Sequence, residues 1–427
     1  MPESTPREKL LTCLQLFLSG DWAFVQLRGE APDEKAFDGD DIDLLGAESS
    51  VDALLDAAQE WVRDGMCHIR VVRQRQRKLE FFLYSIDGRH SLHFDLWIEL
   101  PQLDGGRDWL SFDHVTEIAR PEDGGFLRLP LDVEASVFVH HLVCKKKALS
   151  DPKQQQRLAS YTDRCTQEGH TELAQRLTNI RTTGSVSMED ESFTLEVIRN
   201  KSAAKNGVGR SAAMTHPRNR LVSNWLAAPR KTGWISIMGC DGAGKTSLAT
   251  EIAAKGEVID RVYTGKHLYR KSLLYKLAVI FIRPLTFQSR ENFDEVISPL
   301  VYLRACFGLR LKILFSSSKV TFVDRALPDF LYLDRKTDHP KFSRFSWLMR
   351  WFGCRIPVAH CLTSFENVQK RKDEVTAAGH KIYDDTMYAL HTKNCPTDYV
   401  AFNNDGTLEE SAATLSRIVK RAWPRRG

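Results

Sequence analysis

The sequence lacks any paired arrangement of its cysteines. Nine cysteines are scattered over 427 residues, none forms a Cys-x-x-Cys pair, and no histidine stands at ligand spacing beside one. A structural zinc site and a disulfide framework both require such spacings, so the pattern excludes them. We expect free thiols in a reducing compartment, and therefore a cytoplasmic protein.

Long hydrophobic runs are missing as well. The longest apolar stretch, Leu273–Leu285, is interrupted by Lys276 and Arg283. It is also shorter than the roughly 20 residues that a bilayer-spanning helix needs. We expect no transmembrane segment there, and a buried helix or, with its basic residues, a helix that touches a membrane surface. The N-terminus carries Glu3, Arg7 and Glu8 around a short apolar stretch, whereas a secretory signal has a basic region before a clean apolar core, so we expect no signal peptide.

Acidic residues are absent between Glu196 and Asp241, although charged residues make up 27% of the chain. Eight basic side chains fall in this interval, together with Gly207, Gly209 and Pro217. The composition predicts a flexible basic linker over residues 199–230. Two interpretations stay open: a solvated hinge, or a tether that contacts nucleic acid or another acidic surface.

A chain of this length exceeds one ordinary hydrophobic core, which predicts more than one domain. Thr5-Pro6-Arg7-Glu8 combines a capping oxygen, a first-turn proline and a reciprocal glutamate, so a helix should begin there. Runs rich in β-branched and aromatic residues follow, and the pattern turns helical from about 133 to 180. We expect an α+β domain over 1–130, a helical appendage over 131–198 and an α/β domain over 231–427. Monomer and homodimer both remain open.

Residues 234–249 have the order of a phosphate-binding loop: a hydrophobic strand, a glycine-bearing loop, and a helix. The loop reads Gly239-Cys240-Asp241-Gly242-Ala243-Gly244-Lys245-Thr246, and Ser247 follows it. Small residues let backbone N–H groups converge on phosphates, and the helix N-terminus adds partial positive charge. Lys245 is placed to reach the β- and γ-phosphates, and the Thr246 hydroxyl to coordinate Mg²⁺. The motif predicts a site for ATP and Mg²⁺.

A second acidic signal ends the apolar run Lys319–Val323, which continues into Asp324 and Arg325. Ligands of open parallel sheets gather at the carboxyl ends of the strands. We therefore expect this strand beside the P-loop strand, with Asp324 facing the Mg²⁺ shell. An ordinary strand-end ion pair with Arg325 is the alternative.

Together these motifs resemble the thymidylate kinase branch of the nucleoside monophosphate kinases, whose loop reads GxDGxGK[ST] and whose second motif is a strand ending in Asp-Arg. The resemblance covers the chain from Trp234 to its C-terminus. It implies a parallel sheet flanked by helices and transfer of the ATP γ-phosphate to a nucleoside monophosphate. It also implies that Asp241 faces the acceptor and that Arg325 sits near the transferring phosphoryl group.

The same resemblance assigns a lid and an acceptor site. Lys370-Arg371-Lys372 corresponds to the lid, so Arg371 is expected to contact ATP, and Arg290 or Arg304 would bind the acceptor. Ala326 follows the Asp-Arg pair, where the family commonly carries an aromatic residue against the sugar. The acceptor therefore stays open.

Three carboxylates stand out in the first hundred residues. Asp41 and Asp43 alternate along one expected strand and so share a face, and a neighbouring strand can bring Asp95 beside them. Such a trio can hold two Mg²⁺ ions for attack on an α-phosphate. With the turn at Gly29, the constellation resembles the DNA polymerase β-type nucleotidyltransferase superfamily, although Glu30 replaces that family's second small turn residue.

Three functions remain open from the sequence. The first is an ATP-dependent kinase acting on a nucleoside monophosphate or a related phosphate-bearing acceptor. The second is a kinase and nucleotidyltransferase acting on a glycan or a lipid-linked sugar. The third is a nucleotide-binding regulatory or defence protein, in which ATP occupancy switches the two domains and the basic linker contacts nucleic acid.

Overall fold

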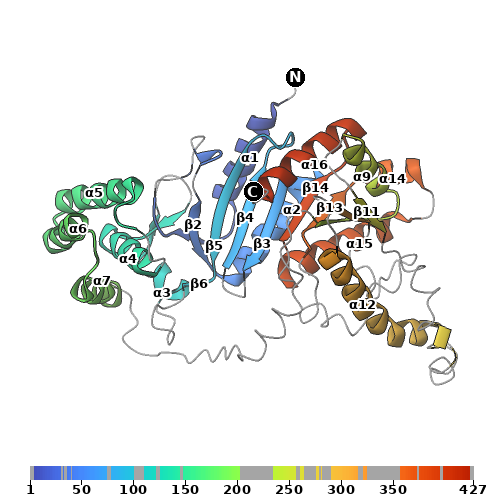
Figure 1. Ribbon diagram of the computed structural model, residues 1–427. Helices are drawn as coiled ribbons and strands as arrows, with labels where there is room; N and C mark the ends of the chain where they lie inside the picture. Colours follow the sequence, from blue (N-terminus) through green and yellow to red (C-terminus); the bar gives the residue numbers. More distant parts are fainter. Residues whose placement is uncertain are drawn as a thin grey trace.

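One large mixed sheet, with helices on its faces and at one end, organises the α/β fold (Figure 1). The structure is a computed structural model. It describes residues 4–29, 32, 36–39, 41–74, 78–100, 110–121, 126–144, 148–201, 234–255, 260–263, 276–277, 280, 290–315, 321–324, 356–372, 375–394 and 398–423.

Local sequence signals set the N-terminal elements. Helix α1 (Pro6–Ser19) begins with a capping box, in which the Thr5 hydroxyl accepts from the Glu8 N–H and the Glu8 carboxylate accepts from the Thr5 N–H. The elements that follow are β1 (Phe24–Gln26), β2 (Ile42–Gly46), α2 (Glu48–Arg63), β3 (His68–Gln74), β4 (Lys78–Tyr84), β5 (Ser91–Trp97), β6 (Glu99–Leu100), β7 (Leu110–Ser111), α3 (Phe112–Thr116), β8 (Arg120–Pro121) and β9 (Leu127–Arg128). The predicted helix start and strand runs are confirmed.

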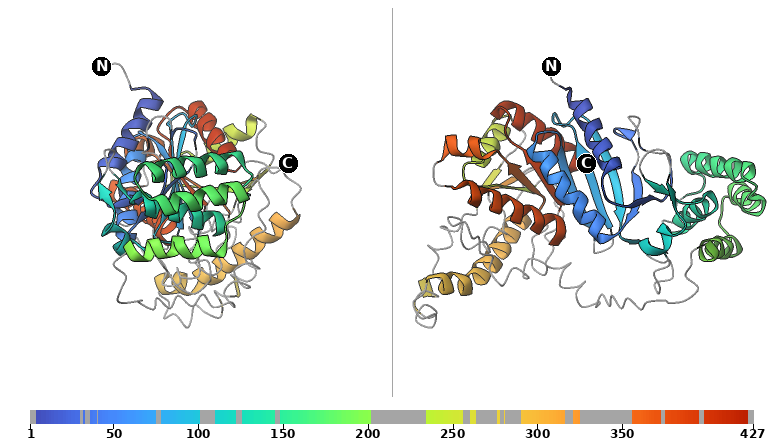
Figure 2. Two further views of the ribbon diagram at one scale, coloured as in Figure 1. Left: turned by 90° about the vertical axis from the view of Figure 1, so that its left-hand side faces the viewer. Right: turned by 180° about the vertical axis from the view of Figure 1, so that it is seen from behind.

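Four helices gather at one end of the sheet, as the two views of Figure 2 show. They are α4 (Leu131–Cys144), α5 (Pro152–Gln167), α6 (Thr171–Thr183) and α7 (Met188–Lys201). They enclose a hydrophobic cluster of their own around Phe138, Leu158 and Leu177, and a second cluster joins α4 and α7 to β1. Since α7 continues to Lys201, residues 199–201 are helical rather than part of the linker. The rest of the predicted linker, 202–230, lies outside the described residues.

The C-terminal strands form a parallel sheet. Its elements are β10 (Trp234–Met238), α9 (Lys245–Ala254), β11 (Asp260–Tyr263), α12 (Arg290–Phe315), β12 (Thr321–Asp324), β13 (Val358–Leu362), α14 (Phe365–Arg371), α15 (Ala377–Ala389), the π-helical turn η5 (Leu390–Asn394), β14 (Asp398–Asn403) and α16 (Leu408–Ala422). The strand order is β11-β12-β10-β13-β14, with every pair parallel. All five carboxyl ends therefore meet at one edge, where ligands of such sheets bind.

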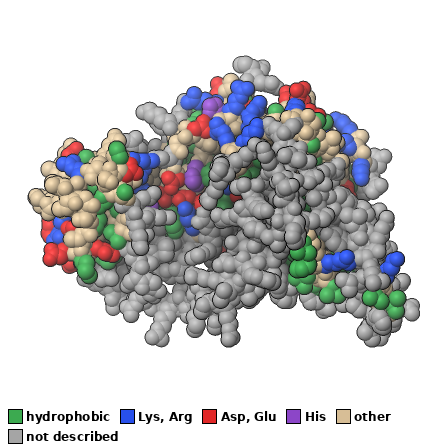
Figure 3. All heavy atoms as spheres, in the orientation of Figure 1, with side chains coloured by type: hydrophobic (Ala, Val, Ile, Leu, Met, Phe, Trp, Pro, Cys, Tyr) green, Lys and Arg blue, Asp and Glu red, His purple; other side chains and the backbone are tan. Residues whose placement is uncertain are grey.

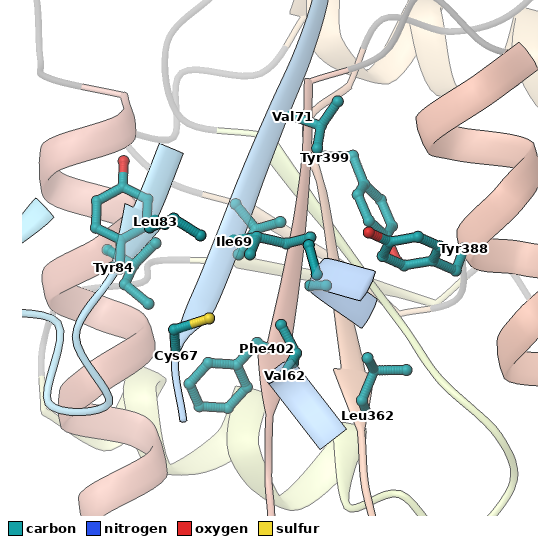
Figure 4. Close-up of a cluster of buried hydrophobic side chains, with 14 of the residues drawn as sticks. Val62, Cys67, Ile69, Val71, Leu83, Tyr84, Leu362, Tyr388, Tyr399 and Phe402 are labelled. Atoms are coloured by element: carbon teal, nitrogen blue, oxygen red, sulfur yellow. The ribbon is translucent and has the colours of Figure 1, made fainter. Parts of the chain in front are cut away.

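Strand β14 also pairs antiparallel with β3, with Val400 opposite Arg70. This ladder joins the C-terminal and N-terminal strands into one twelve-stranded sheet, in the order β11-β12-β10-β13-β14-β3-β4-β5-β2-β1-β9-β8. The hydrophobic core runs across the junction: Figure 4 shows Ile69 of β3 with Tyr399 of β14 and Tyr388 of α15. No sequence signal predicted this ladder, which we call the seam.

Polar contacts reinforce the seam from both faces. The Asp398 carboxylate accepts two hydrogen bonds from the Arg70 guanidinium, at 2.8 and 2.7 Å. Asp385 on α15 pairs with Arg63 and accepts from the Gln59 amide at 3.1 Å, both on α2. Bidentate and partly buried ion pairs of this kind fix the relative orientation of the elements they join more firmly than exposed pairs do.

Helix α16 spans the same junction. Its Arg417 donates to the Asp87 carbonyl at 2.8 Å, and its Arg421 pairs with Asp38 at 2.7 Å. Both acceptors belong to N-terminal loops. The C-terminal helix therefore clamps the N-terminal strands as well as its own sheet.

One expectation fails in the stretch Leu273–Leu285. Lys276, Leu277 and Ile280 are the described helical residues within it, and all three are exposed rather than buried. Among the described residues, no helix combines the length and the apolar character needed to cross a bilayer.

Candidate functional site

The loop between β10 and α9 lies at the carboxyl edge of the parallel sheet. Gly244 caps α9 with φ +78°, in the left-handed region. A Cβ there would stand 2.9 Å from Arg371 Nη1 and 3.1 Å from Asn404 Nδ2. The backbone conformation therefore favours glycine, and the loop can expose its N–H groups without a side chain at this position.

Lys245 is folded into this loop. Its side chain is buried, and its Nζ donates to the carbonyls of Gly239 at 2.8 Å and Cys240 at 2.6 Å. The ammonium group is therefore already held where the loop curls around it. The strand, loop, lysine and helix together have the geometry of a P-loop.

Other predicted P-loop residues sit around this point. Thr246 and Ser247 are exposed in the first turn of α9, and Asp241 is half-buried in the loop. Strand β12 pairs in parallel with β10, with Asp324 opposite Ile237, which confirms the expected adjacency of the two strands. Arg325 lies outside the described residues.

Arg371 comes from the end of α14 and reaches the loop, where its Nη1 lies 3.4 Å from the Gly242 carbonyl. The lid position predicted from the resemblance is thus beside the P-loop. The two acceptor candidates are both on α12: Arg290 begins that helix, and Arg304 is exposed on it.

Two side chains that sequence reasoning did not assign support the loop from behind. Asn404, buried just after β14, donates its Nδ2 to the Ala243 carbonyl at 2.7 Å. Asp405 accepts from the Ser364 N–H at 2.8 Å and from the Asn367 side chain at 2.9 Å, which fixes the start of α14. Both residues directly follow a parallel strand, and this position could have predicted that they lie at the ligand-binding edge of the sheet.

The three N-terminal carboxylates converge as predicted. Asp43 of β2 stands directly opposite Asp95 of β5 in a parallel pair, and Asp41 precedes β2 on the same side. One carboxylate oxygen from each lies within 4.8 Å of the others. Asp43 and Asp95 are buried, whereas Asp41 is exposed, so the trio opens to solvent on one side.

Basic side chains balance this acidic trio, and the sequence did not predict them. Arg28 pairs with Asp43, and Lys78 pairs with Asp95. Burial raises the pKa of Asp43 despite the nearby Arg28 guanidinium. Burial also opposes ionisation of Asp95, but hydrogen bonds from His93 and Lys78 outweigh it and lower its pKa to about 2.

The trio offers the oxygen ligands that a divalent cation needs. Arg28 and Lys78 both contact Oδ2 atoms, whereas the buried Oδ1 atom of Asp95 faces His93 Nε2 at 3.4 Å. A buried carboxylate oxygen of this kind is a natural ligand for Mg²⁺. Carboxylate oxygens of Asp41 and Asp43 complete the oxygen set, and the Oδ1 atom of Asp43 also accepts from Trp97 Nε1 at 3.3 Å.

The glycine turn before the trio is already engaged. Gly29 has φ +90°, its N–H donates to Glu134 Oε1 of α4 at 3.1 Å, and its carbonyl accepts from Arg128. Glu134 is buried and also accepts from the Tyr161 hydroxyl at 2.8 Å. The N–H that the nucleotidyltransferase resemblance would offer to a phosphate therefore binds a carboxylate of the helical unit. Glu30 lies outside the described residues.

No protein-family model matches the chain, and no curated protein matches it. Among solved structures, there is a likeness to the crystal structure of FlhF complexed with GMPPNP/Mg²⁺. The two chains are 12% identical over 68% of this chain and 99% of that one, with a TM-score of 0.18. A TM-score this low carries no argument about fold or function.

Proposed function

We propose that the chain is an ATP-dependent phosphotransferase whose donor site is the loop at residues 239–246. The observation that carries this proposal is the convergence of two cations on one glycine loop: the buried Lys245 ammonium inside it and the Arg371 guanidinium against it. Phosphoryl transfer depends chiefly on positioning and on neutralising charge, which is what this arrangement supplies.

Each residue has a distinct task in this proposal. Lys245 exchanges its two loop carbonyls for β- and γ-phosphate oxygens, while backbone N–H groups of the loop hold the rest of the triphosphate. Thr246 and Asp324 are the residues that would hold Mg²⁺, which when bound neutralises charge developing on the phosphates. Asp241 and Arg325 would face the acceptor and the transferring group.

The acceptor is a phosphate-bearing small molecule, with a nucleoside monophosphate as the first choice and a glycan or lipid-linked sugar as the second. The regulatory alternative, in which ATP occupancy switches the two domains, is disfavoured by the seam. Its β14–β3 ladder and buried core would have to part for the units to move independently.

Transfer of labelled γ-phosphate from ATP tests the proposal. The acceptor panel contains dTMP, other nucleoside monophosphates and sugar phosphates. Lys245→Ala should lower transfer by at least about a hundredfold, the scale of losing one preorganised charge in a phosphoryl site. Lys255→Ala, at the far end of α9, is the matched control and should transfer normally. Equal activity of wild type and Lys245→Ala would refute the assignment of the donor site.

A second candidate function rests on the acidic trio. Three carboxylates that share one face and fit a divalent cation favour nucleotidyl transfer at the N-terminal site. Label from an α-labelled nucleoside triphosphate should then enter an acceptor, and Asp43→Asn should abolish this reaction. Two variants should leave it unchanged: Lys245→Ala, and Asp64→Asn, whose side chain is exposed at the end of α2. Loss in the Lys245 variant would instead assign that reaction to the P-loop.

A further inference from the structure

Exposed hydrophobic side chains are concentrated in one part of the molecule. Among the described residues, eight large hydrophobic side chains are exposed, and five of them belong to residues 277–311: Leu277, Ile280, Leu300, Phe307 and Leu311. Figure 3 shows hydrophobic side chains beside basic ones at the lower right, in the region that α12 occupies in Figure 1. Scattered exposed residues need no explanation, but a cluster marks an interaction surface.

Three of these residues form a stripe along α12. Leu300, Phe307 and Leu311 are 54%, 63% and 39% exposed, and the exposed Arg304 lies between them. At 100° per residue, these four positions fall within about 60° of arc on a helix. The opposite face is buried through Tyr302, Ala305, Cys306 and Leu309. The body of the protein therefore holds α12 on one side and presents the stripe on the other.

Charge changes along α12: its first two turns carry Glu291, Asp294 and Glu295, but the part that bears the stripe is basic. Residues 300–315 contain three basic residues and no acidic one. Two further stretches of the sequence are basic: residues 264–283 contain five basic residues, and residues 341–355 contain four together with Trp347 and Trp351, with no acidic residue in either stretch. Apolar, aromatic and basic residues without acidic ones are the composition of surfaces that lie on anionic membranes.

We infer that the α12 stripe docks on an anionic lipid surface. Apolar side chains enter the boundary between headgroups and acyl chains, and Arg304 with its neighbours meets the negative headgroups. A second copy of the chain fits less well. A two-fold contact along this stripe would bring Arg304 against its own symmetry mate, which opposes association. This inference does not depend on the proposed phosphotransfer.

Co-sedimentation of the full-length protein with lipid vesicles tests the inference. One set of vesicles is phosphatidylcholine alone, and the other contains phosphatidylserine as well. Leu300→Ser/Phe307→Ser removes the apolar contact, and Arg304→Glu reverses the charge. Met188→Ser is the matched control, because Met188 is 84% exposed but lies on α7. Circular dichroism checks that each variant is folded.

The wild type should sediment with phosphatidylserine vesicles, and much less with phosphatidylcholine alone. The double serine variant should bind about tenfold more weakly. Arg304→Glu should bind at least about fivefold more weakly at low salt, with a smaller difference at high salt. Met188→Ser should bind as the wild type does.

Three results would overturn the inference. The wild type could fail to sediment with anionic vesicles, or the stripe variants could sediment as well as the wild type, which would place lipid contact elsewhere. Alternatively, analytical ultracentrifugation could show a dimer that the double serine variant dissociates. The stripe would then be a contact between copies of the chain.

Discussion

His68 makes the stability of the seam sensitive to acid. It begins β3 and is buried, with its ring stacked on Phe402 of β14 at a centroid separation of 4.7 Å. The Asn403 N–H donates a hydrogen bond to His68 Nδ1, with 3.2 Å between the two nitrogens. The ring proton is therefore on Nε2, which donates to the Ile86 carbonyl at 3.1 Å. Only the neutral ring satisfies both partners.

The magnitude follows from the pKa of this group. Burial lowers the pKa of His68 from its ordinary 6.5 to about 4. Below pH 6.5, His68 is therefore protonated in the unfolded chain but stays neutral in the folded chain, so the free energy of unfolding falls as the pH decreases. The loss can reach about 1.4 kcal/mol per pH unit and should total about 2 kcal/mol between pH 7 and pH 4.5.

Urea unfolding of the wild type and of His68→Asn, measured at several pH values, tests this reasoning. Asparagine keeps an oxygen acceptor near the position of Nδ1 but does not ionise. The variant should be less stable near neutral pH, and its deficit should shrink by about 2 kcal/mol as the pH falls to 4.5. His170→Asn, at the start of α6, measures the background from a histidine outside the seam. A deficit that stays constant over this pH range would refute the buried neutral state.

Four further predictions concern the loop, the seam and the acidic trio. Asn404→Ala should weaken ATP binding about tenfold in calorimetry, because the Ala243 carbonyl loses its buried donor; unchanged affinity would remove Asn404 from the site. Arg70→Ala should lower the free energy of unfolding by about 2–3 kcal/mol, since Asp398 loses a bidentate partner, and an unchanged urea midpoint would contradict this. Tyr388→Phe should cost about 1 kcal/mol in the same assay through loss of its 2.6 Å bond to the Leu55 carbonyl; no cost would mean that water replaces it. Asp95→Asn should abolish binding of Mn²⁺ detected by electron paramagnetic resonance in Lys245→Ala protein, and retained binding there would place the ion elsewhere.

Several features of the candidate sites were predictable because their signals are local. The P-loop follows from glycines at fixed offsets between a strand and a helix, and Gly244 has the positive φ that such a turn requires. Asp41 and Asp43 share a face because strand side chains alternate. The capping box of α1 is written in four consecutive residues.

Other features required the folded chain because they join residues far apart in the sequence. Lys78 neutralises Asp95, Glu134 of α4 occupies the Gly29 N–H, and Asn404 braces a loop 161 residues earlier. Lysines, glutamates and asparagines are common on any surface, so their types alone do not reveal such partners. Their roles arise from strand register and helix packing.

The sequence by itself therefore determined the glycine loop, the acidic strand and the first helix of the chain, since each depends on backbone conformation or residue spacing within one segment. Only the tertiary structure decided that β14 pairs with β3 and that both candidate sites stand on one twelve-stranded sheet. Strand edges pair through backbone N–H and carbonyl groups that every residue carries, so the identity of the partner strand leaves little trace in the sequence. The pairing is selected by the apolar and ionic contacts that the assembled core makes possible.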